Sequence, residues 1–321
     1  MRKKLTMLLA LIVLLLASAY LGAGYLLYDQ LSTVKRNPQN ALNTPAKFQV
    51  NEAPFQAFDT ARYHMPTYDT VRIPSRTPGL MLAGWYVPGD PAAPAIVLTH
   101  GLSSCKCEGA VIVAAGMLHR NGFNVLLYDL RNHGQSDRDD GRTAMGNKEY
   151  LDVLGAWDWL TTVKGFPPER VGLYGASLGA GTTLIAFGQE PRIAAAFVDS
   201  PFSDLRQLID ETLTRQHYPT VLAYSGLLMA RLVGGVDLLA HGPQEAITHD
   251  AGRPIFIAAG TSDHLINVHH TRDLVSLAGQ TGANVTPWYI DGADHHPSAI
   301  LQFPDVYEQH LIAFFRGALE K

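Results

Sequence analysis

A serine flanked by glycines is the most chemically suggestive feature of the chain. Residues Gly175-Ala176-Ser177-Leu178-Gly179 form a Gly-x-Ser-x-Gly motif after a short apolar run. At a sharp turn from a strand into a helix, small residues two positions before and after the serine avoid clashes with both elements. The helix N-terminus then directs backbone N–H groups toward developing negative charge. The motif therefore predicts Ser177 as a nucleophile.

A nucleophilic serine needs a base that removes its proton and a third group that orients the base. Asp263 follows a later apolar run, and His295 and His296 lie in the loop after the run Val285–Ile290. The order serine, acid, histidine is the one used when the serine sits on a strand-to-helix turn of an α/β sheet. We therefore expect Ser177, Asp263 and a histidine of the last loop to act together.

The elements that must position these residues alternate along the chain. Short runs of β-branched and aliphatic residues are separated by longer helical stretches, which is typical of a parallel or mixed sheet flanked by helices. The predicted strands are Val71–Pro74, Leu82–Val87, Ala95–Leu98, Asn124–Leu127, Val171–Tyr174, Ala195–Val198, Pro254–Ala258 and Val285–Ile290. The sequence thus predicts an α/β fold with an eight-stranded, mostly parallel sheet.

The alternation breaks down after the sixth predicted strand. Two segments with helical spacing, Leu205–Leu213 and Val221–Val233, lie between Ser200 and Arg253. We expect residues 201–253 to form a small helical cap over the site. An ordinary surface elaboration is the alternative.

Five landmarks in order make the chain resemble the α/β-hydrolase superfamily, in particular its serine aminopeptidase and ABHD-like branch, which has many membrane-anchored bacterial members. They are Leu98-Thr99-His100-Gly101, the segment Gly122 to Ser136 with Asp129-Leu130-Arg131-Asn132-His133-Gly134, the serine motif, Gly260-Thr261-Ser262-Asp263 and Gly292-Ala293-Asp294-His295. The likeness runs from about Thr44 to the C-terminus. Asn132 departs from the family's usual glycine, and Ala259-Gly260 stands where the family commonly has His-Gly.

The resemblance assigns a role to each site residue. It implies that Ser177 is the nucleophile, Asp263 the orienting acid and His295 the general base, with an oxyanion hole made by the N–H groups of Leu102 and Leu178. The implied activity is hydrolysis of an ester, thioester or amide of a small-molecule or lipid-like acyl substrate, without a metal or organic cofactor. A catalytically silent receptor or scaffold of the same fold, and an acyltransferase with the same triad, are the alternatives.

Other side chains compete for these roles. His296 is the alternative base, and with His295 as the base we interpret His296 as a surface or site-lining neighbour; Asp199 at the end of a strand is the alternative acid. His100 and His133 follow strands, where a histidine more often holds loop shape through backbone hydrogen bonds than transfers protons. His269 and His270 begin a predicted helix, and we interpret them as solvated residues, with a role as ligands as the alternative.

Metal chemistry is disfavoured at both places where the sequence suggests it. Asp294, His295 and His296 have suitable side chains, but adjacent residues rarely converge on one ion. Cys105 and Cys107 are the chain's two cysteines, too few for a disulfide scaffold and without a second ligand pair at zinc spacing. We interpret them as a buried or incidental pair.

The N-terminus resembles a membrane anchor. Arg2-Lys3-Lys4 precedes an uncharged run from Leu5 to Tyr28, which at about 1.5 Å per residue crosses the roughly 30 Å hydrocarbon layer. The basic flank predicts a cytoplasmic N-terminus and an extracytoplasmic catalytic domain. We therefore expect an anchor over 1–28, a solvated linker over 29–46 and a hydrolase domain over 47–321.

A cleavable signal peptide is the alternative to the anchor. Ala17-Ser18-Ala19 has the small-x-small pattern of a cleavage site, and cleavage there releases a periplasmic or secreted protein. It leaves Tyr20–Tyr28 as an apolar new terminus for which the sequence offers no obvious burial partner.

The net charge of −4 carries no basic excess, which argues against a nucleic-acid partner.

Overall fold

The computed structural model describes residues 2–35 and 40–320, which divide into two compact units. We call the first the helical unit; it contains helix α1 (Arg2–Ser32) and residues Leu205–Ala240. We call the second the sheet unit; it contains Val34–Asp204 and His241–Lys321. The expected cap segment, 201–253, is therefore divided between the two units. A cap over the site remains a prediction.

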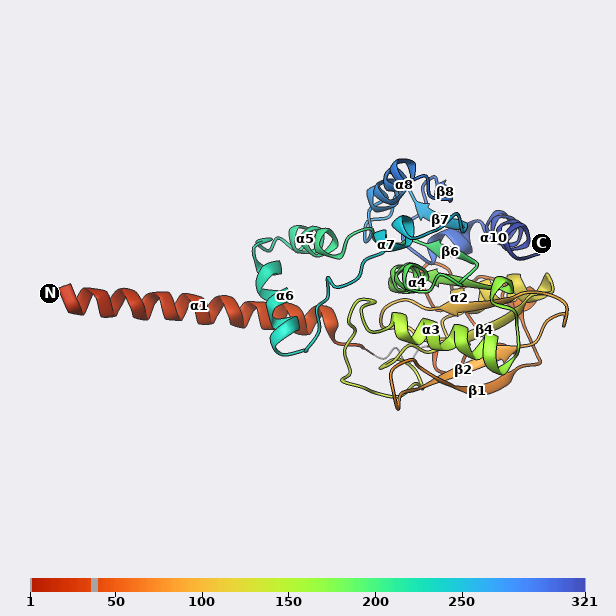
Figure 1. Ribbon diagram of the computed structural model, residues 1–321, viewed down its shortest axis with the longest axis horizontal. Helices are drawn as coiled ribbons and strands as arrows, with labels where there is room; N and C mark the ends of the chain where they lie inside the picture. The colour runs from red at the N-terminus through yellow and green to blue at the C-terminus, as the bar shows by residue number, and fades with distance from the viewer. Residues whose placement is uncertain (1, 36–39, 321) are drawn as a thin grey trace. The chain divides into compact units, whose positions relative to one another are not determined.

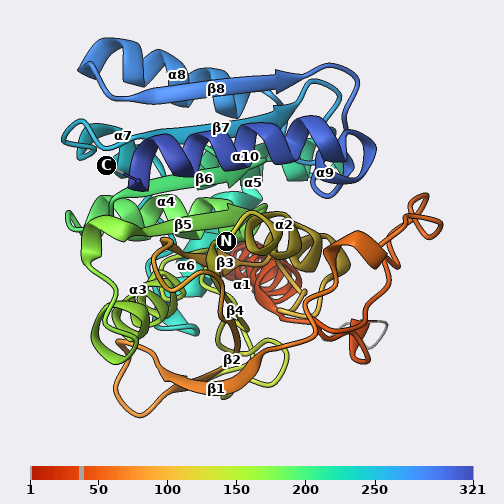
Figure 2. The same ribbon diagram turned by 90° about the vertical axis from the view of Figure 1, so that its right-hand side faces the viewer.

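Eight strands form one sheet in the described part of the sheet unit, which confirms the predicted fold class. They are β1 (Asp69–Pro74), β2 (Met81–Val87), β3 (Ala95–Thr99), β4 (Asn124–Tyr128), β5 (Val171–Ala176), β6 (Ala195–Asp199), β7 (Ile255–Gly260) and β8 (Val285–Ile290). The spatial order is β1-β2-β4-β3-β5-β6-β7-β8, seen from bottom to top in Figure 2. The pairs β1–β2 and β2–β4 are antiparallel, and the strands from β4 to β8 pair in parallel. The carboxyl ends of the parallel strands therefore share one edge.

The helices of the sheet unit cover both faces of the sheet. They are α2 (Gly109–Arg120), α3 (Tyr150–Asp158), α4 (Leu178–Gln189), α7 (Gln244–Thr248), α8 (His269–Thr281), α9 (Ser298–Gln302) and α10 (Pro304–Leu319), labelled in Figure 2; Figure 1 shows most of them from the side. Side chains of α2, α9 and α10 pack on one face, and those of α3, α4, α7 and α8 pack on the other. The central strands β3 to β6 are buried along their whole length, as their continuous apolar runs predict.

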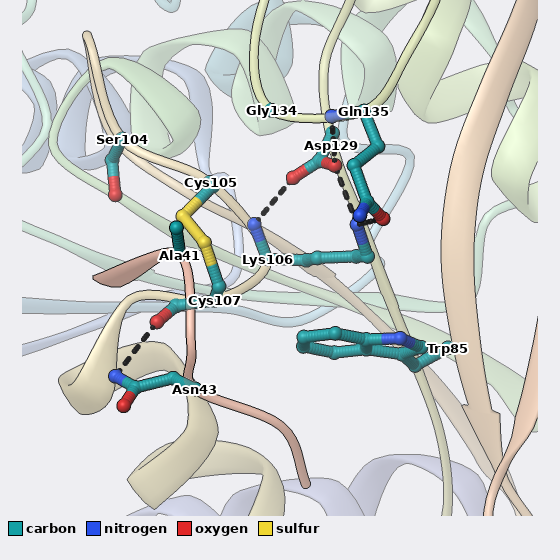
Figure 3. Close-up of a pocket in the computed structure, with 10 residues that line it drawn as sticks. All are labelled: Ala41, Asn43, Trp85, Ser104, Cys105, Lys106, Cys107, Asp129, Gly134 and Gln135. Atoms are coloured by element: carbon teal, nitrogen blue, oxygen red, sulfur yellow. Dashed lines mark hydrogen bonds and ion pairs between the residues drawn. A yellow bond between two sulfur atoms is a disulfide. The ribbon is translucent and has the colours of Figure 1, made fainter. Parts of the chain in front are cut away.

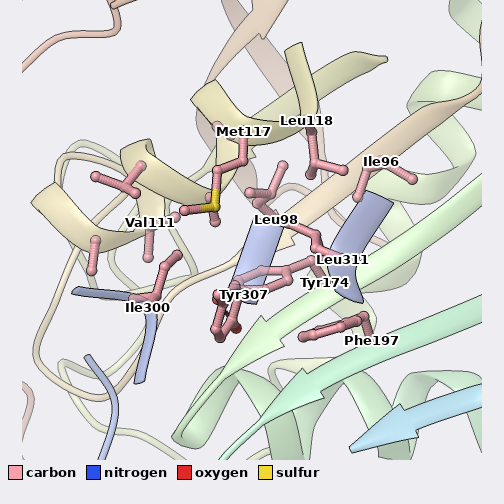
Figure 4. Close-up of a cluster of buried hydrophobic side chains, with 14 of the residues drawn as sticks. Ile96, Leu98, Val111, Met117, Leu118, Tyr174, Phe197, Ile300, Tyr307 and Leu311 are labelled. Carbon is pink, nitrogen blue, oxygen red and sulfur yellow. Dashed lines mark hydrogen bonds between the residues drawn. The ribbon is translucent and has the colours of Figure 1, made fainter. Parts of the chain in front are cut away.

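Aromatic side chains fill the centre of the first of these two cores. Tyr174 of β5 and Phe197 of β6 stack with their ring centroids 5.9 Å apart, and Tyr307 of α10 packs 5.7 Å from Phe197 (Figure 4). Aliphatic side chains of α2, including Val111 and Met117, close this core. Because β5 and β6 end beside the candidate nucleophile, this packing holds the two strand ends rigidly.

The helical unit is built from α1, α5 (Leu205–Arg215) and α6 (Leu222–Leu232). The Tyr20 hydroxyl donates to the carbonyl of Val221 at 2.7 Å, and the Ser225 hydroxyl donates to the carbonyl of Tyr20 at 2.8 Å. Gly24 lies directly against Ser225, where a Cβ would have no room. The expectation that Tyr20–Tyr28 lacks a burial partner is therefore wrong. Cleavage after Ala19 would leave this segment packed on α6.

The first part of α1 differs from this packed end. An 18-residue window of α1 has a mean hydropathy of 2.4 and no buried residue, so the helix is long and apolar enough to cross a membrane. Leu5 to Leu16 are exposed, whereas Leu27 and Tyr28 are buried. The apolar surface of the early turns needs a lipid or protein environment.

The segment expected to be a solvated linker, 29–46, differs from a free chain. Residues 36–39 lie outside the described residues, but the parts on either side are structured. Residues up to Ser32 continue α1, and Val34 donates its N–H to the carbonyl of Gly141 at 3.1 Å. Asn43 is buried and donates to the carbonyl of Cys107 at 3.0 Å. Polar composition predicted solvation, but these side chains satisfy backbone groups of the folded unit instead.

Candidate active site

Ser177 occupies a strained turn between β5 and α4. Its φ of 55° and ψ of −122° lie outside the regions that a non-glycine residue normally adopts. The glycines on either side are required by close approaches: a Cβ on Gly175 would lie 2.3 Å from the carbonyl oxygen of Gly179, and one on Gly179 would lie 2.4 Å from the carbonyl oxygen of Thr99. The local sequence therefore raises the Ser177 hydroxyl at the carboxyl edge of the sheet.

Ser177, His295 and Asp263 lie in hydrogen-bond contact. The Ser177 Oγ is 2.8 Å from Nε2 of His295, and Nδ1 of His295 is 2.7 Å from Oδ2 of Asp263. The other oxygen of Asp263 accepts the N–H groups of Leu265 and Ile266, at 2.9 and 2.8 Å. Asp263 is 4% exposed, so its orientation is fixed by these contacts. The arrangement can draw the serine proton onto the imidazole and stabilise the resulting charge.

The loop after β3 passes beside the nucleophile. A Cβ on Gly101 would lie 3.8 Å from the Ser177 Oγ, so the backbone of Gly101, directly before Leu102, passes close to the hydroxyl. Leu178 is the first residue of α4, whose N-terminal N–H groups point toward the same region. A cavity of about 380 Å³, lined in part by Leu102, Ser177 and His295, opens here. The cavity leaves room for a carbonyl group beside the Ser177 hydroxyl.

His100 and His133 shape this loop through backbone hydrogen bonds, in agreement with the expectation for them. Nε2 of His100 accepts the N–H of Leu130 at 3.1 Å, so the ring proton lies on Nδ1, which donates to the carbonyl of Gly101 at 2.8 Å. Nε2 of His133 accepts the N–H of Ser103 at 3.2 Å. Burial, followed by the charge of His133, lowers the pKa of His100 to about 4, and burial also lowers the pKa of His133. Both rings are neutral at pH 7 and serve as acceptors.

The alternative acid and the alternative base contact each other and lie outside the serine–histidine contact. Nδ1 of His296 is 3.2 Å from Oδ2 of Asp199, whereas His295 contacts Asp263. His296 is 8% exposed, so it is not a surface residue, although it lines the cavity beside Ser177. The expectation that His270 is solvated is wrong, because its ring is buried and accepts the N–H of Ser203 at 3.2 Å.

The side chains of the alternative metal set point to different partners. Oδ1 of Asp294 lies 2.7 Å from Nδ1 of His264, while His295 contacts Asp263 and His296 contacts Asp199. Three adjacent residues whose side chains diverge do not present a common ligand sphere. The metal alternative for this loop therefore has no geometric support.

The two cysteines form a disulfide, which the sequence interpretation did not predict. Cys105 and Cys107 are bonded across Lys106, whose ammonium group lies 2.6 Å from Oδ2 of Asp129 and 4.7 Å from the centre of the Trp85 ring (Figure 3). Lys106 is 2% exposed, so this pair is a buried salt bridge beneath a cavity of about 290 Å³. The disulfide and the salt bridge fix the loop that continues from Leu102. Neither partner of Lys106 is adjacent in sequence, so spacing gave no signal for the contact.

Asn132 departs from the family pattern without disturbing the site. Its φ of 65° is left-handed, a region that favours glycine and that asparagine tolerates better than most residues. Its side chain uses this conformation, because Oδ1 accepts the N–H of Asp139 at 2.8 Å and Nδ2 donates to the carbonyl of Arg142 at 2.7 Å. The departure therefore preserves the turn and adds hydrogen bonds to the following loop.

Sequence comparison identifies the family to which this site belongs. The model of the prolyl oligopeptidase family matches residues 113–321, which include the serine motif and the two loops that carry the acid and the base. The chain belongs to the prolyl oligopeptidase family. This family consists of serine hydrolases with the α/β-hydrolase fold, so the match confirms the superfamily that the sequence landmarks suggested.

The chain is similar to several known proteins, each over a different share of its length. An uncharacterised protein of Mycobacterium tuberculosis is 28% identical over 227 residues, which cover 70% of this chain and 71% of the relative. A thiohydrolase of Aspergillus aculeatus is 30% identical over 161 residues, which cover 49% of this chain and 48% of that protein. A solved esterase of Pyrococcus furiosus superposes with a TM-score of 0.63 over 85% of this chain and 99% of the esterase, at 21% identity. The structural likeness shows the shared fold.

Proposed function

We propose that the chain hydrolyses an ester, thioester or amide through an acyl-enzyme on Ser177. The observation that carries this proposal is the continuous contact from the Ser177 hydroxyl through His295 to Asp263, on a strained turn at the carboxyl edge of the sheet. A serine and a histidine that served only to hold the shape of their loops would not need this series of contacts. A proton-transfer role does.

The chemistry follows from the contacts. His295 accepts the serine proton through Nε2 while the Ser177 Oγ attacks the substrate carbonyl carbon. Asp263 keeps the ring proton on Nδ1 and stabilises the imidazolium. The N–H groups of Leu102 and Leu178 stabilise the negative oxygen. His295 then protonates the leaving group, and a water molecule activated by the same ring releases the acyl group.

The substrate is proposed by class only. The cavity beside Ser177, of about 380 Å³, suits a small-molecule or lipid-like acyl group. The thiohydrolase relative and the esterase neighbour support thioester and ester substrates without selecting one.

The location of the site follows from α1. We propose that α1 anchors the chain in a membrane with its basic N-terminal residues in the cytoplasm and the sheet unit outside it. A periplasmic or secreted chain cleaved after Ala19 is the alternative, and the packing of Tyr20 on α6 supports a stable cleaved form. Both forms export the sheet unit, whose disulfide suits an oxidising compartment.

The proposal is tested with the full chain in dodecyl maltoside micelles. p-Nitrophenyl esters of increasing acyl length, an acyl thioester and aminoacyl amides are offered to the wild type and to Ser177→Ala. We expect wild-type turnover of at least one class and a loss of several orders of magnitude in Ser177→Ala, because only binding and the oxyanion hole remain. Adding an alcohol or thiol acceptor and analysing the products separates hydrolysis from acyl transfer. Equal turnover by both proteins contradicts the proposal.

A further inference from the structure

A buried imidazole between two carboxylates lies beside the candidate catalytic residues. Nδ1 of His296 is 3.2 Å from Oδ2 of Asp199, and Nε2 is 3.3 Å from Oε1 of Glu108. The Nε2 contact has ion-pair distance but not the angles of a hydrogen bond. The three residues are between 0 and 8% exposed. The reaction proposed above uses none of these side chains, so their burial requires another explanation.

Each member of this trio is tied to a different part of the catalytic machinery. The backbone carbonyl of Asp199 accepts the N–H of Ser177 at 2.9 Å, so Asp199 marks the strand end that supports the nucleophile. Glu108 precedes α2 and closes the loop that begins at Leu102; its Oε2 accepts a hydrogen bond from the hydroxyl of Ser104 in that loop. His296 follows His295 directly. The His296 imidazole therefore links the strand end that supports Ser177, the loop from Leu102 to Glu108 and the loop that carries His295.

Asp199 is held independently of His296. The hydroxyl of Tyr307 donates to Oδ2 of Asp199 at 3.0 Å, and the hydroxyl of Tyr174 lies 3.1 Å from that of Tyr307. The hydroxyl of Ser200 donates to Oδ1 at 3.0 Å and also accepts the N–H of His296 at 3.3 Å. These hydrogen bonds thus hold the Asp199 carboxylate in a fixed position at the end of β6. The His296 ring transmits that position to Glu108, which has fewer contacts of its own.

Charge explains why a histidine occupies this place. Burial lowers the pKa of His296, but the contacts with the Asp199 and Glu108 carboxylates and their negative charges outweigh it and raise the pKa to about 10. Burial raises the pKa of Glu108, whereas the contact with His296 brings it below its ordinary value. The other titratable groups around the trio are Tyr307 and Tyr174 beside Asp199, and His100 and Glu52 beside Glu108. None of them supplies a second cation at pH 7, because His100 is neutral there.

We propose that His296 is a positioning residue. Its imidazolium holds two loops against the end of β6 beside Ser177: the loop from Leu102 to Glu108 and the loop that carries His295. The proposal rests on the hydrolase function proposed above. A neutral side chain at this position leaves two buried carboxylates facing each other, so that the Glu108 end of the loop moves away. The N–H of Leu102 then shifts relative to the Ser177 hydroxyl. Such a shift weakens stabilisation of the transition state more than it weakens binding of the substrate.

The test measures turnover per functional active site rather than per protein. Wild type, His296→Gln, Glu108→Gln and Ser177→Ala are prepared as full chains in dodecyl maltoside, and sites are counted by the end point of fluorophosphonate labelling. Hydrolysis of an aliphatic ester such as ethyl butyrate is followed with a pH-stat from pH 6 to pH 11. For His296→Gln we expect kcat per labelled site to fall about 10- to 100-fold with KM within about threefold, as for a displacement of about 1 Å.

The pH profile separates a charge clamp from a merely structural residue. In the wild type we expect kcat to decline as His296 loses its proton near pH 10. Glu108→Gln removes one of the two carboxylates that stabilise the imidazolium, so the decline is expected at lower pH. In His296→Gln the decline disappears. Glu108→Gln keeps the test decisive even if His296→Gln does not fold.

Two results overturn the proposal: a kcat per labelled site of His296→Gln within about twofold of the wild type, or an alkaline decline that does not move in Glu108→Gln. If Ser177→Ala turns the ester over as fast as the wild type, the hydrolase function itself fails. If Ser177→Ala is inactive while the His296 and Glu108 variants behave as the wild type, only the positioning role fails.

Discussion

At the scale of residues, the structure separates two aspartates that the sequence left in competition. Asp263 follows β7 and Asp199 ends β6 at the same edge of the sheet, and both contact a histidine of the last loop. Adjacent residues of that loop contact different partners: His295 contacts Ser177 and Asp263, whereas the buried His296 contacts Asp199. The sequence predicted one acid and one base; it could not show that the unused candidates pair with each other.

Asp263→Asn tests the role of the orienting acid. An amide at this position can donate to Nδ1 of His295 and so favours the ring tautomer that cannot accept the serine proton. We expect kcat for ester hydrolysis to fall by about three to four orders of magnitude with little change in KM. Asp273→Asn, an exposed change on α8, is the control and is expected to retain wild-type kcat. A wild-type kcat in Asp263→Asn would show that another group orients the base.

At the scale of elements, the turn between β5 and α4 and the loops after β3, β7 and β8 make the site. The alternation of apolar runs predicted each end of the strands to within two residues. The signal is clear because buried central strands must be apolar on both faces. The serine motif was predicted from its glycines for the same local reason that the structure shows. The Lys106–Asp129 pair and the burial of His270 depend on contacts between distant segments, which spacing along the chain does not encode, and the Cys105–Cys107 disulfide joins two cysteines whose spacing alone does not show that they are bonded.

Gly179→Ala tests the packing of the turn. The added Cβ would lie within 2.4 Å of the Thr99 carbonyl and 2.5 Å of the His100 carbonyl, and backbone atoms cannot yield easily. We expect the free energy of unfolding to fall by about 3 kcal/mol. Gly279→Ala in α8 is the matched control, because a Cβ there meets nothing within 4 Å and the change is expected to add about 0.5–1 kcal/mol. Denaturant unfolding of the two variants in micelles measures both values, and equal effects would refute the packing argument.

At the scale of the whole molecule, the polar segment before the sheet and the insertion after β6 account for the main departures from expectation. Residues 29–46 look like a solvated linker in composition, yet Asn40 and Asn43 are buried because they satisfy backbone and side-chain groups of the sheet unit. Residues Leu205–Ala240 have helical spacing, but their partner within the helical unit is α1, a helix that the sequence assigned to the membrane alone. Patterning within a segment shows that a face is apolar and does not show what covers it.

The buried histidine His100 makes stability depend on pH. Its pKa is about 4 in the folded chain and about 6.5 when unfolded, so between these values the unfolded chain binds more protons. The free energy of unfolding therefore rises with pH across this window, by at most about 1.4 kcal/mol per pH unit from this group. His100→Gln retains an acceptor for the N–H of Leu130 and is expected to reduce the slope. Unfolding midpoints of the two proteins at pH 4.5 and 6.5 measure it; identical slopes contradict the prediction.

The N-terminal helix gives a prediction about the location of the chain. An uncleaved anchor keeps the protein in the membrane pellet after an alkaline carbonate wash, with an intact mass that includes Arg2-Lys3-Lys4. We expect this result, because α1 exposes its apolar side chains from Leu5 to Leu16. Membrane fractionation followed by intact-mass spectrometry checks it. A soluble chain beginning at Tyr20 would instead establish the signal-peptide alternative.

The most direct test of the central claim, that Ser177 is an activated nucleophile, is a covalent one. The full chain is treated with a fluorophosphonate, digested and analysed by peptide mass spectrometry. We predict one adduct per chain, on Ser177, formed more slowly in Asp263→Asn and absent in Ser177→Ala. An adduct on a different residue, or equal labelling of the wild type and Ser177→Ala, would contradict the account.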